Sequence, residues 1–174
     1  MGAFSKAKIE WAPFAVCAPT EKAPYPRSLT TPEGLGDRLR FVAFAEKQAE
    51  NAFFLAAHSY PALPESVKNT WLELSREEAK HLSWLLARMK ELGVDPAARP
   101  QSLALWNSFD RCSTASEFAL FMANAEERGR IAGEQFYETL LKTDSVTGEL
   151  FRKIAEEEKM HIALARSVMQ DLGI

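Results

Sequence analysis

Two short stretches of the sequence, Glu78-Ala-Lys-His81 and Glu158-Lys-Met-His161, decide the fold. In each, a histidine follows a glutamate at a spacing of three. Side chains at this spacing emerge on one face of an α-helix and can converge on one ion. A single Glu-x-x-His is common by chance, but two of them in a chain with only three histidines form a specific signal.

Both stretches interrupt the apolar stripe of an amphipathic helix. The core-facing lines read Leu74, Glu78, His81 and Leu85 in one helix, and Phe151, Ile154, Glu158, His161, Ala165 and Val168 in the other. A buried carboxylate costs several kcal/mol unless it is paired or bound to metal. Glu77, Glu156 and Glu157 fall off these lines, so we expect them to face solvent.

Two further glutamates interrupt apolar lines in the same way. Glu46 stands between Val42 and Phe53 on the core line of its helix. Glu126 aligns with small and apolar residues, whereas its neighbour Glu127 aligns with polar ones. Glu126 is therefore predicted to point inward.

An internal repeat supports this choice independently. Adding 80 to the residue numbers of Glu46, Glu78 and His81 gives Glu126, Glu158 and His161, and Phe41, Ala45 and Ala49 map onto Phe121, Ala125 and Gly129. The repeat indicates a helical hairpin used twice around a pseudo-twofold axis. One glutamate from each of two helices, with Glu-x-x-His from the other two, is the ligand set of di-iron and di-manganese carboxylate bundles.

These six residues are therefore expected to bind two metal ions. Four carboxylates balance two divalent cations, and hard oxygen ligands with one imidazole per ion favour Fe, with Mn or Zn as alternatives. Glu78 and Glu158 are candidate bridges between the ions. Glu50, one turn after Glu46, is either an extra ligand or a supporting carboxylate; we favour the supporting position.

The sequence predicts an all-α chain with one long crossover connection between its second and third helices. Helix starts are indicated by Thr31-Pro32 and by the capping box Thr114-Ala-Ser-Glu117, and Gly93 is a typical helix end. The expected helices span about 31–58, 64–92, 114–141 and 147–171, and a loop of about twenty residues joins the second to the third. Residues 1–30 are Pro-rich and predicted to form an extended arm pinned by Trp11 and Phe14, and residues 31–174 the four-helix domain.

The composition argues against several classes of function. The net charge of −3 gives no overall basic field, so nucleic acid is not an expected partner. The two cysteines cannot supply a disulfide framework or paired metal knuckles. Neither a membrane span nor a secretory signal is visible, and we expect a cytoplasmic protein.

The stretch Glu46-Lys-Gln-Ala49 followed by Glu78-x-x-His81 resembles the first half of rubrerythrins and the ferritin-like superfamily. From Thr31 onward the chain also resembles a largely uncharacterised bacterial branch of that superfamily. Glu126-Glu-Arg128, ahead of the last Glu-x-x-His, is similar to tRNA-modifying di-iron hydroxylases. Two cysteines cannot form the rubredoxin module of rubrerythrins, and Leu85 occupies the position of the radical tyrosine in ribonucleotide reductase small subunits.

The resemblance implies a di-iron oxidoreductase that activates dioxygen or peroxide, with an unidentified small-molecule substrate, or dioxygen or peroxide alone, and an unidentified electron donor. A ferroxidase, another metal-handling protein or a peroxide scavenger is the alternative, and a tRNA-modifying hydroxylase is a further one. Iron storage requires a large hollow oligomer. The arm and the central loop fit a discrete oligomer, such as a homodimer, better than a cage.

Overall fold

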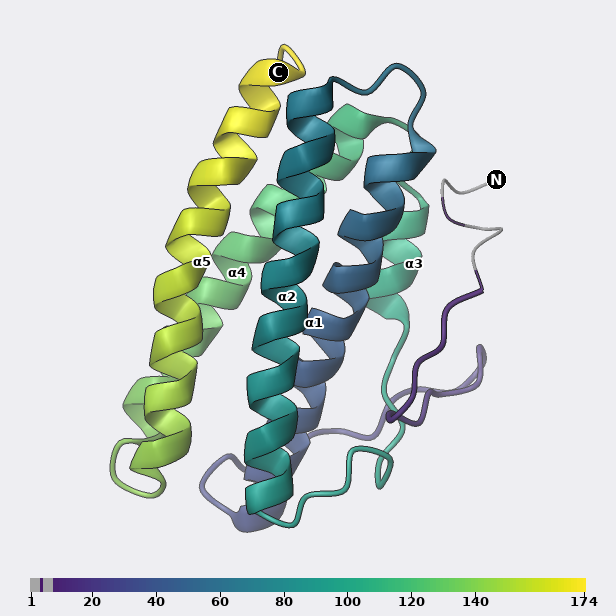
Figure 1. Cartoon of the computed structure of the whole chain (residues 1–174). Coiled ribbons are helices and arrows are strands. Elements are labelled where there is room, and N and C mark those ends of the chain that lie inside the picture. Colours follow the sequence, from purple (N-terminus) through teal and green to yellow (C-terminus); the bar gives the residue numbers. More distant parts are fainter. Residues whose placement is uncertain (1–3, 5–7) are drawn as a thin grey trace.

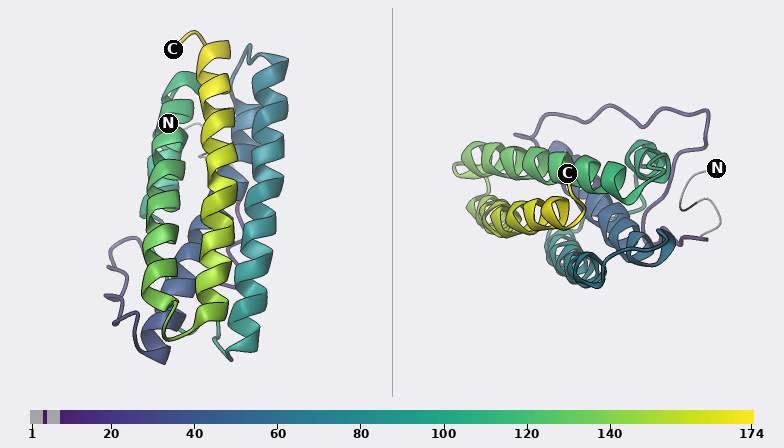
Figure 2. Two further views of the ribbon diagram at one scale, coloured as in Figure 1. Left: turned by 90° about the vertical axis from the view of Figure 1, so that its left-hand side faces the viewer. Right: turned by 90° about the horizontal axis from the view of Figure 1, so that it is seen from above.

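The computed structural model of the chain describes Phe4 and residues 8–174. These residues form five α-helices and one isolated β-bridge, which confirms the all-α expectation. The helices are α1 (Pro32–Ser59), α2 (Glu65–Glu91), α3 (Ala104–Asp110), α4 (Ala115–Leu140) and α5 (Ser145–Asp171). The four long helices lie side by side with their axes roughly aligned, and the short α3 lies beside α1 (Figures 1 and 2).

Local capping interactions set the ends of the long helices. The Thr31 hydroxyl accepts a hydrogen bond from the Gly34 amide at 3.1 Å, and Thr114 accepts one from the Glu117 amide at 3.1 Å. Past the end of α2, Gly93 has a φ of +66°, a conformation that glycine adopts without strain. The expected bounds of all four long helices are confirmed to within one turn.

The connection between α2 and α4 differs from the expected loop because it contains α3. The Trp106 amide donates to Gln48 Oε1 of α1 at 2.8 Å, and Phe109 is fully buried. A helix of seven residues is too short to show a clear apolar period, and no side chain caps its start. The sequence therefore gave no signal for it.

The extended segment before α1 lies along the body of the molecule (Figure 1). Its aromatic anchors behave as expected, because the rings of Trp11 and Phe14 lie 5.5 and 5.3 Å from the ring of Phe44. Backbone hydrogen bonds tie it to the central connection, with Cys17 donating to Gln101 and Gln101 donating to Ala15. Part of the predicted arm, residues 1–3 and 5–7, lies outside the described residues.

Two apolar clusters fill the interior. The Trp71 cluster includes Ala52, Phe53, Trp71, Leu74, Phe118, Met122 and Val168. The Phe44 cluster includes Leu39, Phe44, Leu85, Met89, Leu140, Phe151 and Ile154. Along α1 and α5 the chain passes from the Phe44 cluster to the Trp71 cluster, and along α2 and α4 it passes the other way. Thus α2 and α4 run antiparallel to α1 and α5.

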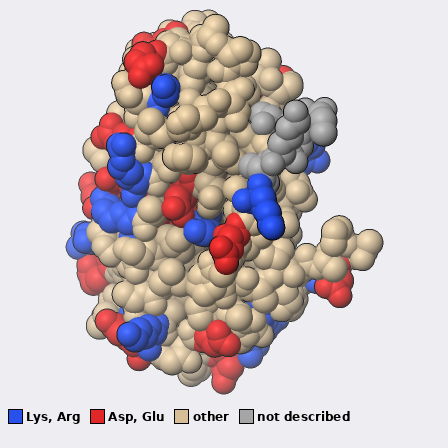
Figure 3. Space-filling view, turned by 45° about the vertical axis from the view of Figure 1, so that its right-hand side comes forward, with Lys and Arg blue, Asp and Glu red and all other residues tan. Residues whose placement is uncertain are grey.

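Charged side chains of both signs are interspersed on the surface drawn in Figure 3. Many of them pair within a helix at a spacing of three, as do Arg152 with Glu149 and Lys159 with Glu156. None of the described helices has the length and apolar character needed to cross a bilayer.

Candidate metal centre

The six sequence-predicted ligands come from the middle of four helices and meet between the two apolar clusters. Glu46 lies on α1, Glu78 and His81 on α2, Glu126 on α4, and Glu158 and His161 on α5. Each is at most 9% exposed, and both histidines are completely buried. The structure therefore brings together the residues that the helical stripe and the repeat selected.

The ligand atoms form two overlapping groups of four, each with its atoms within 4.8 Å of one another, and a third group of three joins Glu158 to both histidines. One group of four contains Glu46, Glu78, His81 and Glu158, and the other contains Glu78, Glu126, Glu158 and His161. Glu78 and Glu158 belong to both. This geometry can hold two ions that share two carboxylates, each ion having one further glutamate and one histidine.

The histidines present the same ring nitrogen to the carboxylates. His161 Nδ1 lies 3.1 Å from Glu158 Oε2, 3.3 Å from Glu78 Oε1 and 3.6 Å from Glu126 Oε2. His81 Nδ1 lies 3.4 Å from Glu158 Oε1. The two imidazoles stack with their centroids 5.3 Å apart.

Several polar atoms of this cluster are buried without a hydrogen-bond partner among the described residues. They are Glu78 Oε1, His81 Nδ1, Glu158 Oε2 and both ring nitrogens of His161. The distances between them are short, but the hydrogen-bonding geometry is not met. Buried polar atoms are rarely left unsatisfied, and metal coordination would satisfy all of these except one ring nitrogen of His161. The donor set of hard carboxylates and one imidazole per group fits Fe or Mn.

The electrostatics of the cluster also favour a bound cation. Burial raises the pKa of Glu46, Glu78 and Glu126, and neighbouring glutamate charges raise it further. Burial would also raise the pKa of Glu158, but contacts with Glu126 and the two histidines outweigh it and lower that pKa. Burial lowers the pKa of His161, but the surrounding carboxylates raise it by more, so the net shift is upward. Protons and cations therefore compete for these carboxylates.

Glu157 contacts the cluster although the sequence pattern did not select it. The prediction that it faces solvent is wrong, because its side chain is 27% exposed and its Oε2 lies 2.9 Å from His81 Nε2. Lys80 pairs with the same oxygen at 2.9 Å. Glu77 is also half-buried and pairs with Lys80, whereas Glu156 is exposed as expected. Successive helix residues are about 100° apart, so the side chain before Glu158 lies on the flank of α5 that faces α2. Its position directly before Glu158 is the one feature of the sequence that could have indicated this contact.

Glu50 belongs to neither ligand group. Its carboxylate lies 3.5 Å from Lys47 Nζ, and its backbone carbonyl accepts a hydrogen bond from the Ser75 hydroxyl. A supporting role for Glu50 stays a prediction. The contact that Glu157 makes with His81 is the kind that fixes the orientation of a metal-binding imidazole.

A cavity of about 310 Å³ lies against one side of the cluster. All four glutamates line it, and neither histidine does. Its other walls are mainly apolar side chains and the backbone of Gly129 and Gly133 on α4. A molecule in this cavity would thus meet the carboxylates, while the histidines are enclosed where α2 packs against α5.

No curated protein and no solved structure matches this chain. A family model does match, over residues 10–173, and its description reads protein of unknown function (DUF455). The match spans both Glu-x-x-His motifs, both single glutamates and most of the extended segment before α1. The chain therefore belongs to the DUF455 family.

Proposed function

We propose that this protein is a ferritin-like, di-iron carboxylate oxidoreductase that activates dioxygen or peroxide to act on an organic small molecule. The observation that carries the proposal is the pair of buried ligand groups that share Glu78 and Glu158 beside a cavity. Manganese in one or both positions is the alternative that this donor set accommodates.

The directions of the helices support the ferritin-like part of the proposal. Because α2 and α4 run the same way, the segment from Leu92 to Thr114 must return along the length of the molecule. One long crossover in an otherwise up-and-down set of four helices is the connectivity of ferritin-like bundles.

When bound, two iron ions would supply the electrons and open coordination positions that oxygen chemistry requires. The histidines and the glutamates of this chain would have different roles in holding these ions. His81 is held in place by Glu157, and both imidazoles are shielded from the cavity. Glu46 and Glu126 each belong to one group only and line the cavity, so they are the carboxylates free to shift as a molecule arrives.

The cavity also favours an organic substrate over the alternatives. A protein that only oxidises or stores iron needs a path for ions rather than a mainly apolar space beside its carboxylates. A tRNA hydroxylase would need a basic surface to hold the phosphate backbone, and on the face in Figure 3 the two signs of charge are interspersed. Size-exclusion chromatography with light scattering tests storage directly, because a monomer or dimer excludes a cage.

The proposed activity is tested by loading the protein with Fe(II) without oxygen and then mixing it with dioxygen or hydrogen peroxide. We expect a rapid absorbance change in the wild-type protein and in Glu127→Gln. In Glu126→Gln the change should be slower or absent. Glu127 is a matched control because it adjoins Glu126, is 47% exposed and pairs with Arg130.

If the loaded wild-type protein showed no absorbance change with either oxidant, the proposed oxidoreductase would be ruled out. Equal behaviour of Glu126→Gln and Glu127→Gln would place the reaction away from this cluster.

A further inference from the structure

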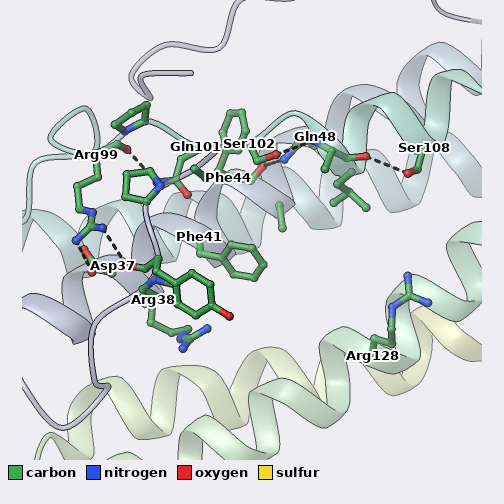
Figure 4. A pocket seen from close by; sticks show the side chains of 18 of the residues that line it. Asp37, Arg38, Phe41, Phe44, Gln48, Arg99, Gln101, Ser102, Ser108 and Arg128 are labelled. Carbon is green, nitrogen blue, oxygen red and sulfur yellow. Dashed lines mark hydrogen bonds and ion pairs between the residues drawn. The ribbon is translucent and has the colours of Figure 1, made fainter. Parts of the chain in front are cut away.

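A second and larger cavity, of about 760 Å³, lies outside the first. Its walls come from the extended segment at residues 23–26, from α1, from residues 99–108 including α3, and from α4. Figure 4 shows this space between α1 and the connecting segments on one side and α4 on the other. The backbone bonds that join Ala15 and Cys17 to Gln101 hold two of these walls together.

The outer and inner cavities share four lining residues, namely Phe41, Ala45, Leu105 and Arg128. They are therefore neighbouring chambers on either side of one boundary. The inner chamber reaches the four glutamates, and the outer chamber is bordered by the exposed arm. Together they lie in series between the surface and the carboxylate side of the candidate metal centre, separated by the side chains that line both.

Two arginines extend into this space, and neither forms a salt bridge with another described residue. In Figure 4 the side chains of Arg38 from α1 and Arg128 from α4 both point toward the gap between the helices. The Nε atom of Arg38 is buried with no hydrogen-bond partner among the described residues, and its guanidinium lies 5.0 Å from the centre of the Phe136 ring. Within the described part of the chain, Arg128 forms no salt bridge either, and it lies 5.9 Å from the Phe121 ring.

The one acid in the wall of the outer chamber, Asp37, cannot neutralise them. Its carboxylate is already paired with Arg27 at 2.7 Å, Arg99 at 3.0 Å and Arg40 at 3.2 Å. The lining of the outer chamber contains Arg38, Arg99 and Arg128 against this one carboxylate, which leaves a positive excess. The outer chamber is thus cationic, and the boundary toward the inner chamber consists of Arg128 and the apolar side chains of Phe41, Ala45 and Leu105.

We propose that these chambers bind an organic anion with an apolar body. Its carboxylate or phosphate group pairs with Arg38, whose Nε is buried without a partner among the described residues, and its apolar part extends past Phe41 and Leu105 toward the glutamates. Arg128 lies at the other end of the gap and adds positive charge to the chambers. A cation would be repelled by the arginines, and a neutral molecule would displace water from them without pairing their charge. Binding of the anion does not depend on the proposed function; only its identification as the substrate rests on that function.

The test uses two fluorescent probes of similar shape. 1-Anilinonaphthalene-8-sulfonate carries an apolar body and one anionic group, and N-phenyl-1-naphthylamine has the same body without the charge. We expect Arg38→Gln to weaken binding of the sulfonate roughly tenfold, the loss of one charge-assisted contact, and Arg128→Gln to weaken it by about threefold, the loss of a more distant charge. Binding of the neutral probe should stay within about twofold. Arg76→Gln is the control and should change neither, because Arg76 is an exposed residue of α2 that forms no salt bridge with another described residue.

Competition then identifies the anionic group. Decanoate and decyl phosphate should displace the sulfonate probe well, whereas decanol and decylamine should displace it poorly. The stronger competitor of the two anions shows whether the site prefers a carboxylate or a phosphate. Gly129→Leu is a second variant, because a side chain at Gly129 meets no atom within 4 Å and would occupy the inner chamber. It should weaken both probes and all long-chain competitors.

Equal loss of both probes in the arginine variants, or no loss of either, would overturn the inference. Metal content is measured on the same samples, so the two proposals can fail separately. Two ions per chain with no arginine dependence defeats only the organic-anion site. Arginine-dependent binding without any bound metal defeats only the proposed oxidoreductase.

Discussion

Glu156 and Glu157 are adjacent and chemically identical, yet they occupy different environments. Glu156 is exposed and pairs with Lys159, whereas Glu157 lies between Lys80 and His81 Nε2. Contacts to Lys80 and His81 lower the pKa of Glu157 despite the opposing effect of burial. It is therefore a carboxylate at neutral pH and can accept a hydrogen bond from the Nε2–H group of His81, which leaves Nδ1 of His81 to face the glutamates.

We predict that Glu157→Gln weakens the binding of one of two metal ions by about tenfold, because partners of a metal-binding histidine commonly contribute 10- to 100-fold. The measurement is a competition titration with a chelating dye and Mn(II) or Zn(II). Glu156→Gln should bind both ions like the wild-type protein. Identical affinities for Glu157→Gln and Glu156→Gln would remove Glu157 from the site.

Asp37 supports the arm and the outer chamber through its three arginines. Hydrogen bonding from Arg27 lowers its pKa to about 2, against the opposing effect of burial. Its ordinary pKa of about 3.9 applies in the unfolded chain, so the stabilisation is complete above pH ~4 and is lost as the pH falls toward 2.

Asp37→Asn should therefore lower the free energy of unfolding by about 2 kcal/mol at pH 7, and the difference from wild type should shrink below pH ~4. Denaturant titrations at several pH values measure this. Asp171→Asn, at the exposed end of α5, is the control. A difference that stays constant down to pH 2 would show that the charge of Asp37 is not the cause.

At the scale of the helix, two glycines of α4 contact different surroundings. A Cβ at Gly129 would meet no atom within 4 Å, whereas one at Gly133 would lie 3.1 Å from the Cβ of Ala155 on α5. Gly133 thus permits close packing of α4 on α5, and Gly129 leaves room in the inner cavity.

Replacing each of these two glycines by alanine is expected to change the stability of the protein in opposite directions. Gly129→Ala should stabilise the protein by about 0.5–1 kcal/mol, the usual cost of glycine inside a helix. Gly133→Ala should destabilise it, because α5 must move to accept the methyl group. Thermal unfolding of both variants provides the comparison, and a destabilised Gly129→Ala would mean that the space beside it is filled.

The long helices were predictable because their signals are local: a hydroxyl cap at Thr31, a capping box at Thr114 and a glycine after α2. The six buried polar residues were predictable because each breaks an apolar line and the repeat pairs them. The short α3 has neither a cap nor a full period. Glu157 depends on which neighbouring helix its flank faces, and the two arginines depend on the gap between α1 and α4. These features arise only when distant segments pack together.

At the scale of the whole molecule, metal binding should be coupled to proton release. Because burial and neighbouring glutamates raise the pKa values of Glu46, Glu78 and Glu126, protons compete with a cation for these carboxylates. We expect the affinity for Mn(II) to fall as the pH falls. Calorimetric titrations in buffers of different ionisation enthalpy should show net proton release, and binding without it would contradict this electrostatic description of the cluster.

The most direct test of the two-metal centre is an anomalous-difference map from crystals of the iron-loaded protein, recorded at the iron absorption edge. We predict two peaks, one among Glu46, Glu78, His81 and Glu158 and the other among Glu78, Glu126, Glu158 and His161. A single peak, or peaks away from these six residues, would contradict the proposed centre.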